Sequence, residues 1–170
     1  MISDHMPFGG ALADLASAFG IEISNAFAVD ATAIAHLSPE SVDSAGFFMF
    51  RRADGTLSAH PVTEGRTDAE RVDSVATDAG CALRLPAAGE SLLTLGPSAV
   101  ALMPEVSWKF PESTPRQAIG GWSQGGVMRF GRGRVAIFCD AFPIFPPELR
   151  ISAQVDHPFR SMLITCFGPS

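Results

Sequence analysis

The chain has 170 residues, of which 46% are hydrophobic and 18% charged; this suits one globular domain with its own core and excludes a disordered composition. Its formal net charge of −6 argues against nucleic acid or an anionic membrane as a partner, because both need concentrated Lys and Arg. No stretch is apolar for long enough to span a membrane, and no signal peptide is visible, so the compartment stays open with the cytoplasm as the default expectation.

A strand end, a loop, a helix and a second strand are predicted first. Ile2 suits the last position of a strand, and residues 21–23 suit a short strand. A helix over residues 9–19 is predicted from one apolar stripe at helical spacing, formed by Leu12, Leu15, Ala16 and Phe19. Gly20 is a plausible stop for this helix. Together these elements predict part of a βαβ unit.

The next stretch is less regular. Residues 31–37 suit a helical turn that Ser38-Pro39 would end, and residues 47–50 suit a strand. Asp54-Gly55 is a turn signal. His60-Pro61 is expected at the entry to a strand, with His60 bonded to nearby backbone, because a residue before proline favours an extended conformation.

From residue 72 onward the pattern is mostly β. Short apolar or alternating runs separated by Gly and Pro predict strands at residues 72–75, 81–83, 91–95 and 99–103. Residues 127–130 and 134–139 predict a hairpin, with Gly131 and Gly133 supplying positive φ in its turn. Both tryptophans flank proline-containing loops and are expected to cover the core.

The last thirty residues behave differently. Residues 142–170 contain several prolines and follow neither the helical nor the strand period, so they predict an irregular tail after a domain spanning residues 1–141. An α/β domain would usually place a helix after a strand such as residues 134–139, and none is predicted here.

Three cysteines lie far apart in the sequence. Cys81, Cys139 and Cys166 form no Cys-x-x-Cys pair, which argues against a zinc site of the common spacing, and their odd number favours reduced thiols. Burial and the neighbouring Asp140 would both raise the pKa of the Cys139 thiol. Cys139 and Cys81 are therefore expected to be small core residues.

Several segments together resemble one family. They are Ser3–Gly10, Phe50–Gly65, Arg71–Ala76, Leu102–Glu105 and Gln124–Phe138. Over residues 2–141 the chain resembles bacterial proteins of unknown function with a class I glutamine amidotransferase-like fold, related to trehalose-utilisation-type domains. The resemblance implies an α/β, flavodoxin-like sandwich with added β-hairpins. Members of the family carry further βα units before Ser3 and a closing helix after Asp140, so the resemblance also implies a chain truncated at both ends.

The resemblance directs attention to the turn at Ser3-Asp4-His5. In amidotransferases of this fold the corresponding strand-to-helix turn holds a nucleophilic cysteine, and this turn has none. Hydrolysis of glutamine by the usual Cys–His–Glu route is therefore not supported. Ser3 also lacks the Gly-x-Ser-x-Gly surroundings that expose a nucleophile on a strained turn.

Candidate site residues lie at two predicted strand ends. Asp4 and His5 follow the first strand, Asp140 follows the strand at 134–139, and parallel strands would bring all three to one edge of the sheet. They could serve acid–base chemistry or bind a metal, or else cap loops and pack as structural residues. The amides near Gly9 and Gly10, at the start of the predicted helix, could bind an anionic ligand.

Two functional hypotheses follow. The first is a non-catalytic or small-ligand-binding module of a larger protein, which keeps an amidotransferase-like scaffold without its nucleophile. The second is a hydrolase acting through Asp4, His5 and Asp140, with or without the assistance of a metal ion. A small-molecule ligand or a missing domain of the larger protein is the expected partner, and the sequence specifies no cofactor and no metal ligands.

Overall fold

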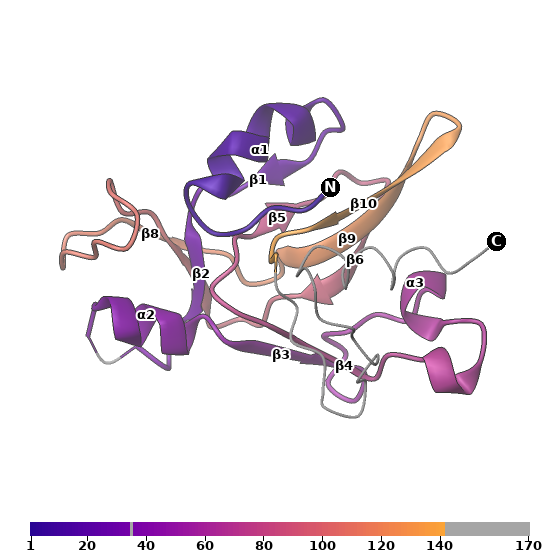
Figure 1. Cartoon of the computed structure of the whole chain (residues 1–170), viewed down its shortest axis with the longest axis horizontal. Coiled ribbons are helices and arrows are strands. Elements are labelled where there is room, and N and C mark those ends of the chain that lie inside the picture. Colours follow the sequence, from indigo (N-terminus) through magenta and orange to yellow (C-terminus); the bar gives the residue numbers. More distant parts are fainter. Residues whose placement is uncertain (35, 142–170) are drawn as a thin grey trace, which may run out of the picture.

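The computed structural model describes residues 1–34 and 36–141 as a mixture of helices and sheets (Figure 1), which confirms the α/β expectation in its broad sense. The predicted tail at residues 142–170 lies outside the described residues. The elements, in chain order, are α1 (Phe8–Ser17), β1 (Glu22–Ile23), β2 (Phe27–Asp30), α2 (Pro39–Ala45), β3 (Phe48–Arg51), α3 (Pro61–Glu64), a 3-10 turn (Asp68–Glu70), β4 (Ser74–Thr77), β5 (Leu83–Arg84), β6 (Gly89–Thr94), β7 (Ala99–Leu102), β8 (Arg116–Ala118), β9 (Ser123–Phe130) and β10 (Gly133–Phe138).

The strands form three sheets. The largest has the order β1-β5-β9-β10 with β6 also paired to β9; a second has the order β2-β7-β8, and β3 pairs with β4. Every strand ladder in the described ranges is antiparallel. Figure 1 shows β9 and β10 as a long hairpin that extends away from the other elements. No helix within the described ranges is both long and apolar enough to cross a bilayer.

One parallel contact joins the start of the chain to the end of β10. Ile2 forms a parallel bridge with Phe138; the Ser3 N–H donates to the Phe138 carbonyl at 2.8 Å, and the Phe138 N–H donates to the Met1 carbonyl at 3.1 Å. This confirms the expectation that the first segment and the strand at 134–139 run in the same direction and end at one edge of the sheet.

The segment after the bridge contains the predicted helix but not the predicted βαβ unit. Helix α1 begins one residue before the expected range of 9–19 and ends two residues before its end. Gly20 follows the helix with a φ of +73°, a conformation that favours glycine. Ala16 of α1 packs with Ile21 in one buried cluster. The following strand, β1, pairs antiparallel with β5, so the βαβ expectation is wrong.

Two Xaa-Pro pairs begin helices at positions where the sequence predicted other structure. Ser38 accepts a hydrogen bond from the Ser41 N–H at 3.1 Å and caps α2, with Pro39 at its first turn, so Ser38-Pro39 starts a helix and does not end one. His60 caps α3 in the same way: its Nδ1 accepts from the Val62 N–H at 3.1 Å. The predicted strand entry at His60-Pro61 is therefore wrong. Proline suits the first turn of a helix because its missing N–H has no partner there.

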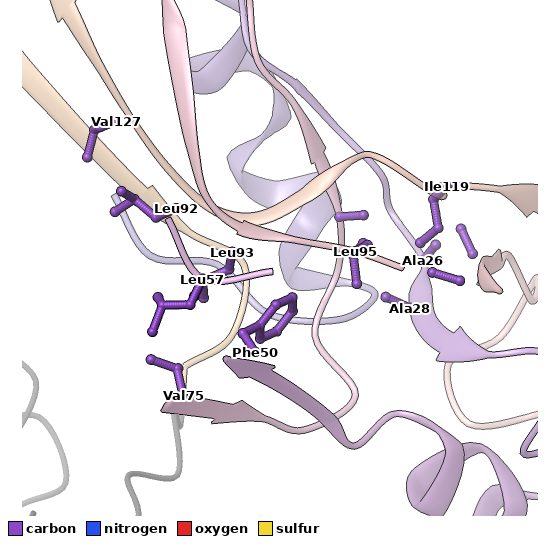
Figure 2. Packing of buried hydrophobic residues seen from close by; sticks show 13 residues of the cluster. Ala26, Ala28, Phe50, Leu57, Val75, Leu92, Leu93, Leu95, Ile119 and Val127 are labelled. Atoms are coloured by element: carbon purple, nitrogen blue, oxygen red, sulfur yellow. The ribbon is translucent and has the colours of Figure 1, made fainter. Parts of the chain in front are cut away.

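The main buried cluster lies between β3, β4 and the β6–β9 layer. Figure 2 shows Phe50 of β3 and Val75 of β4 beside Leu57, with Leu92 and Leu93 of β6 above them. All of these side chains except that of Leu57 come from segments that the sequence predicted as strands. Strands β2 and β8 were not predicted. In the β9–β10 turn only Gly131 has the expected positive φ, +55°, so that expectation is wrong for Gly133.

Candidate functional site

The Asp4-His5 turn and the end of β10 form a common rim. Asp4 follows the bridged segment at Ile2, and its carboxylate accepts the His5 N–H at 2.7 Å. The backbone N–H of Ala141, three residues after the end of β10, also interacts with the Asp4 carboxylate. The parallel bridge therefore does bring the predicted residues Asp4, His5 and Asp140 to one edge.

A cavity of about 220 Å³ opens at this rim. Its lining combines three carboxylates with two rings, in the residues Asp4, His5, Asp43, Asp78, Ala79 and Trp108. These residues come from four segments: the turn before α1, helix α2, the loop after β4 and the loop between β7 and β8. Chain segments that are far apart in the sequence thus converge on a single hollow, which is typical of a ligand site.

Aromatic packing fixes the orientation of His5. Its ring stacks on Phe27, with centroids 4.6 Å apart and planes 13° apart, and meets the edge of Trp108 at 5.1 Å. Its Nδ1 lies 2.6 Å from the Met6 carbonyl oxygen, which can only accept, so Nδ1 carries the proton in this contact. The second ring nitrogen, Nε2, is then the acceptor of the neutral imidazole.

Two carboxyl groups in the cavity wall, those of Asp4 and Asp78, have a raised pKa. Burial raises the pKa of Asp4, against the opposing effect of the His5 N–H. Burial also raises the pKa of Asp78, and the negative charges of Asp43 and Asp4 raise it further. The wall therefore gathers negative charge at a free-energy cost, which a bound cation would offset.

Replacement of Asp4 by Asn should change how stability depends on pH. Because the pKa of Asp4 is raised above its ordinary value of 3.8, the folded protein binds this proton more tightly than the unfolded chain. Stability is therefore expected to fall as the pH rises from 3.8 through the raised pKa, and Asp4→Asn should reduce that fall. Urea unfolding followed at a series of pH values measures the difference. If stability depended on pH in the same way in both proteins, a raised pKa of Asp4 would be contradicted.

Backbone strain is concentrated at the cavity. Among the described residues, only Ala79 and Trp108 carry a side chain at positive φ, with values of 50° and 63°. Both line the cavity. Such conformations cost about 1–3 kcal/mol each and gather at ligand and active sites, where the surrounding structure holds them.

Asp140 is buried beside Asp78 of the cavity wall and is not itself part of the lining. Only 3% of its surface is exposed, and its carboxylate accepts the backbone N–H of Asp78. Through this bond Asp140 holds Asp78 and Ala79 in the wall. The sequence left open two roles for Asp140, one in chemistry and one in structure. This placement agrees with the structural role, in which the carboxylate accepts a backbone N–H in a turn.

The helix start at Gly9 and Gly10 makes internal contacts. The Gly9 N–H donates to the His5 carbonyl at 3.4 Å, and the Gly10 N–H donates to Asn25 Oδ1 at 3.0 Å. A Cβ at Gly9 would lie 2.5 Å from the Ser24 carbonyl oxygen, so this glycine permits a close approach between α1 and the segment after β1. The structure thus gives these two amides partners within the chain, where an outward-facing anion site was expected.

Among the described residues, no cysteine or serine side chain lines the cavity. Cys81 and Cys139 are buried, and Ser3 is 5% exposed with its hydroxyl 3.5 Å from the Asp4 carbonyl oxygen. Over residues 1–34 and 36–141 no group of three or more His, Cys, Asp and Glu side chains converges closely enough to hold a metal ion. The acidic groups instead surround a space larger than an ion.

Asp43, Asp78 and Trp108 were not among the predicted site residues. Asp43 lies in α2, a helix that was not predicted from the sequence. Trp108 was expected to cover the core, and it does pack against Phe27, with ring centroids 4.8 Å apart. Asp78 had a usable signal, because it directly follows a strand and precedes Ala79-Gly80. Comparisons with protein-family models, with curated proteins and with solved structures found no match.

Proposed function

We propose that the chain is a non-catalytic small-ligand-binding module and that its ligand is a small organic cation. The observation that carries this proposal is the presence of Asp4, Asp43 and Asp78 in one cavity wall together with the indole of Trp108. Three carboxylates supply negative charge, and an indole face attracts ammonium groups more strongly than other aromatic rings do.

The size and shape of the cavity support an organic ion over a bare metal ion. The volume of about 220 Å³ accommodates several non-hydrogen atoms, and the acidic side chains line its wall without converging on one point. An alkylammonium group needs no fixed coordination geometry, since its charge is spread over its surface. Charge on the wall and an apolar ring then act together on one ligand.

Choline is a suitable probe because it has an uncharged isostere, 3,3-dimethylbutan-1-ol. Trp108 reports on the cavity, while Trp122 lies elsewhere, with the Arg84 guanidinium 4.5 Å above its ring. In a Trp122→Phe variant, choline should therefore change the fluorescence of the remaining tryptophan. The isostere should bind at least about tenfold more weakly, because a desolvated cation–π contact contributes about 2 kcal/mol and 1.4 kcal/mol is a factor of ten.

Matched carboxylate variants test where choline binds. Asp78→Asn should weaken binding in the same fluorescence titration, because it removes a negative charge from the wall. Asp14→Asn, an exposed change on α1 away from the cavity, should leave the affinity unchanged. Equal binding of choline and its isostere, or equal effects of the two variants, would contradict a cation site at this cavity.

An amidotransferase-like, flavodoxin-like scaffold remains part of the proposal. Its support is local: a strand segment parallel to β10 is followed by the Asp4-His5 turn and then by α1, which is the order of a strand-to-helix elbow. The turn contains no cysteine, consistent with a binding role in place of glutamine hydrolysis. The antiparallel ladders of the remaining sheet do not add to this support.

A hydrolase acting through Asp4, His5 and Asp140 is the second candidate. The observation in its favour is the Nδ1 contact of His5 with the Met6 carbonyl, which leaves Nε2 as a proton acceptor. The position of Asp140 is less favourable, because its carboxylate is buried against the Asp78 N–H. Loss of any hydrolytic activity in His5→Gln but not in Asp14→Asn would support this candidate.

A further inference from the structure

Two cysteines that are 58 positions apart in the sequence lie side by side, Cys81 two residues after Ala79 of the cavity wall and Cys139 directly before Asp140. The Cys81 N–H donates to the Cys139 carbonyl at 2.9 Å, so the two backbones are direct neighbours. Both side chains are fully buried in one apolar cluster with Leu83 and Ile137. The two thiols are also within hydrogen-bonding reach of each other.

We propose that Cys81 and Cys139 are a site of oxidative modification, at which thiol–disulfide exchange with a small-molecule disulfide forms one intramolecular disulfide bond during folding. The thiolate of one cysteine attacks glutathione disulfide and releases one glutathione, giving a mixed disulfide. The other cysteine then attacks that bond and releases the second glutathione. The two cysteines lose two electrons and two protons in total, and the glutathione disulfide is reduced to two thiols.

The disulfide is expected to form during folding, and not afterwards, because both thiols are buried in the folded protein. In the folded protein neither thiol reaches solvent. The pKa of Cys139 is raised well above its ordinary range, mainly by the hydrogen bond with Cys81 and also by burial. The folded, reduced protein should therefore resist exchange, since the thiolate is the reacting form. The unfolded chain exposes both thiols, and folding then brings them together.

The bond would reinforce one wall of the ligand cavity. Segment 78–81 and segment 139–140 are already joined by the Asp140–Asp78 hydrogen bond and by the Cys81–Cys139 backbone hydrogen bond. A covalent link at Cys81 and Cys139 would fix these two segments together next to Asp78 and Ala79 in the chain. It would also close a long loop, which restricts the unfolded chain and raises stability.

The test uses the full chain with Cys166→Ser, so that only two thiols remain. The protein is unfolded in urea, refolded with a mixture of reduced and oxidised glutathione, and analysed by intact mass, thiol alkylation under denaturing conditions and thermal melting. We expect a mass lower by the two hydrogens, no alkylated thiols, and a Tm higher than that of the reduced protein by on the order of 10 °C. The native reduced protein should keep both thiols under the same mixture.

Single-cysteine proteins provide the control. Cys81→Ser and Cys139→Ser, each combined with Cys166→Ser, should give at most a glutathione adduct and no rise in Tm. Refolded two-cysteine protein that retains both alkylatable thiols would overturn the proposal. A linked protein that has lost its native far-UV circular dichroism, or that melts below the reduced form, would overturn it equally, because the bond would then be incompatible with the fold.

Discussion

Phe27→Ala is expected to lower the free energy of unfolding by about 3–5 kcal/mol, the cost of deleting a large, fully buried side chain. Phe27 has no exposed surface, and its ring packs against three other rings. The distances between ring centroids are 4.6 Å to His5, 4.8 Å to Trp108 and 5.1 Å to Phe110. Its removal would leave a void behind the cavity wall and release the stacked face of His5. Urea unfolding followed by circular dichroism measures the loss.

Phe47→Ala is the matched control for this substitution. Phe47 is 47% exposed beside β3, so its truncation removes little buried surface and should change stability by less than about 1 kcal/mol. Similar losses for the two variants would show that Phe27 does not hold the packing assigned to it.

Gly80→Ala is expected to destabilise the protein by about 3 kcal/mol, a large effect for the addition of one methyl group. A Cβ at Gly80 would lie 2.1 Å from the Cys139 carbonyl oxygen and 3.2 Å from Asp140 Cβ. Since the clashing atom belongs to the backbone, the end of β10 must shift. That shift would break the Cys81–Cys139 backbone hydrogen bond of 2.9 Å.

Gly96→Ala isolates this steric effect from the general effect of replacing glycine. A Cβ at Gly96 would meet nothing within 4 Å, and its φ is not positive, so alanine should be neutral or stabilise by up to about 1 kcal/mol through the unfolded chain. Both variants are compared by chemical denaturation at one pH. A neutral Gly80→Ala would contradict the close contact between segments 78–81 and 139–140.

The elements that the sequence predicted best are those whose signal is local. The apolar stripe of α1, the strand at Phe48–Arg51 and the β9–β10 hairpin all depend on the period of a short segment and on a turn residue such as Gly131. The parallel approach of Ile2 to Phe138 was also predicted, because an apolar strand ending in an acidic residue suggested a common edge.

The errors in the predicted elements have one main physical source. At Ser38-Pro39 and His60-Pro61 the proline was interpreted only through the extended conformation that it imposes on the preceding residue. That same extended conformation suits an N-cap, with proline in the first turn, so both pairs begin helices. The missed strands β2 and β8 are short, and their partner β7 supplies the hydrogen bonds that define them.

The candidate site was predicted in part. Asp4 and His5 lie where the sequence placed them, because their turn directly follows the bridged segment at Ile2. Asp43, Asp78 and Trp108 reach the cavity through long-range packing, and no local period predicts which loops meet there. The Gly10 N–H has the same kind of long-range partner, Asn25, and Ser24 approaches Gly9 from the same segment, whereas the partner of the Gly9 N–H, His5, is local.

The most direct test of the account is a nitrogen-15 NMR titration of the unmodified chain with choline, which follows the two tryptophan indole N–H signals, assigned with Trp122→Phe. The account predicts that the Trp108 signal shifts progressively and saturates while the Trp122 signal does not move, and that 3,3-dimethylbutan-1-ol shifts Trp108 only at concentrations at least about tenfold higher. An unmoved Trp108 signal, or equal shifts at both tryptophans, would contradict a cation-binding cavity formed by Asp4, Asp78 and Trp108.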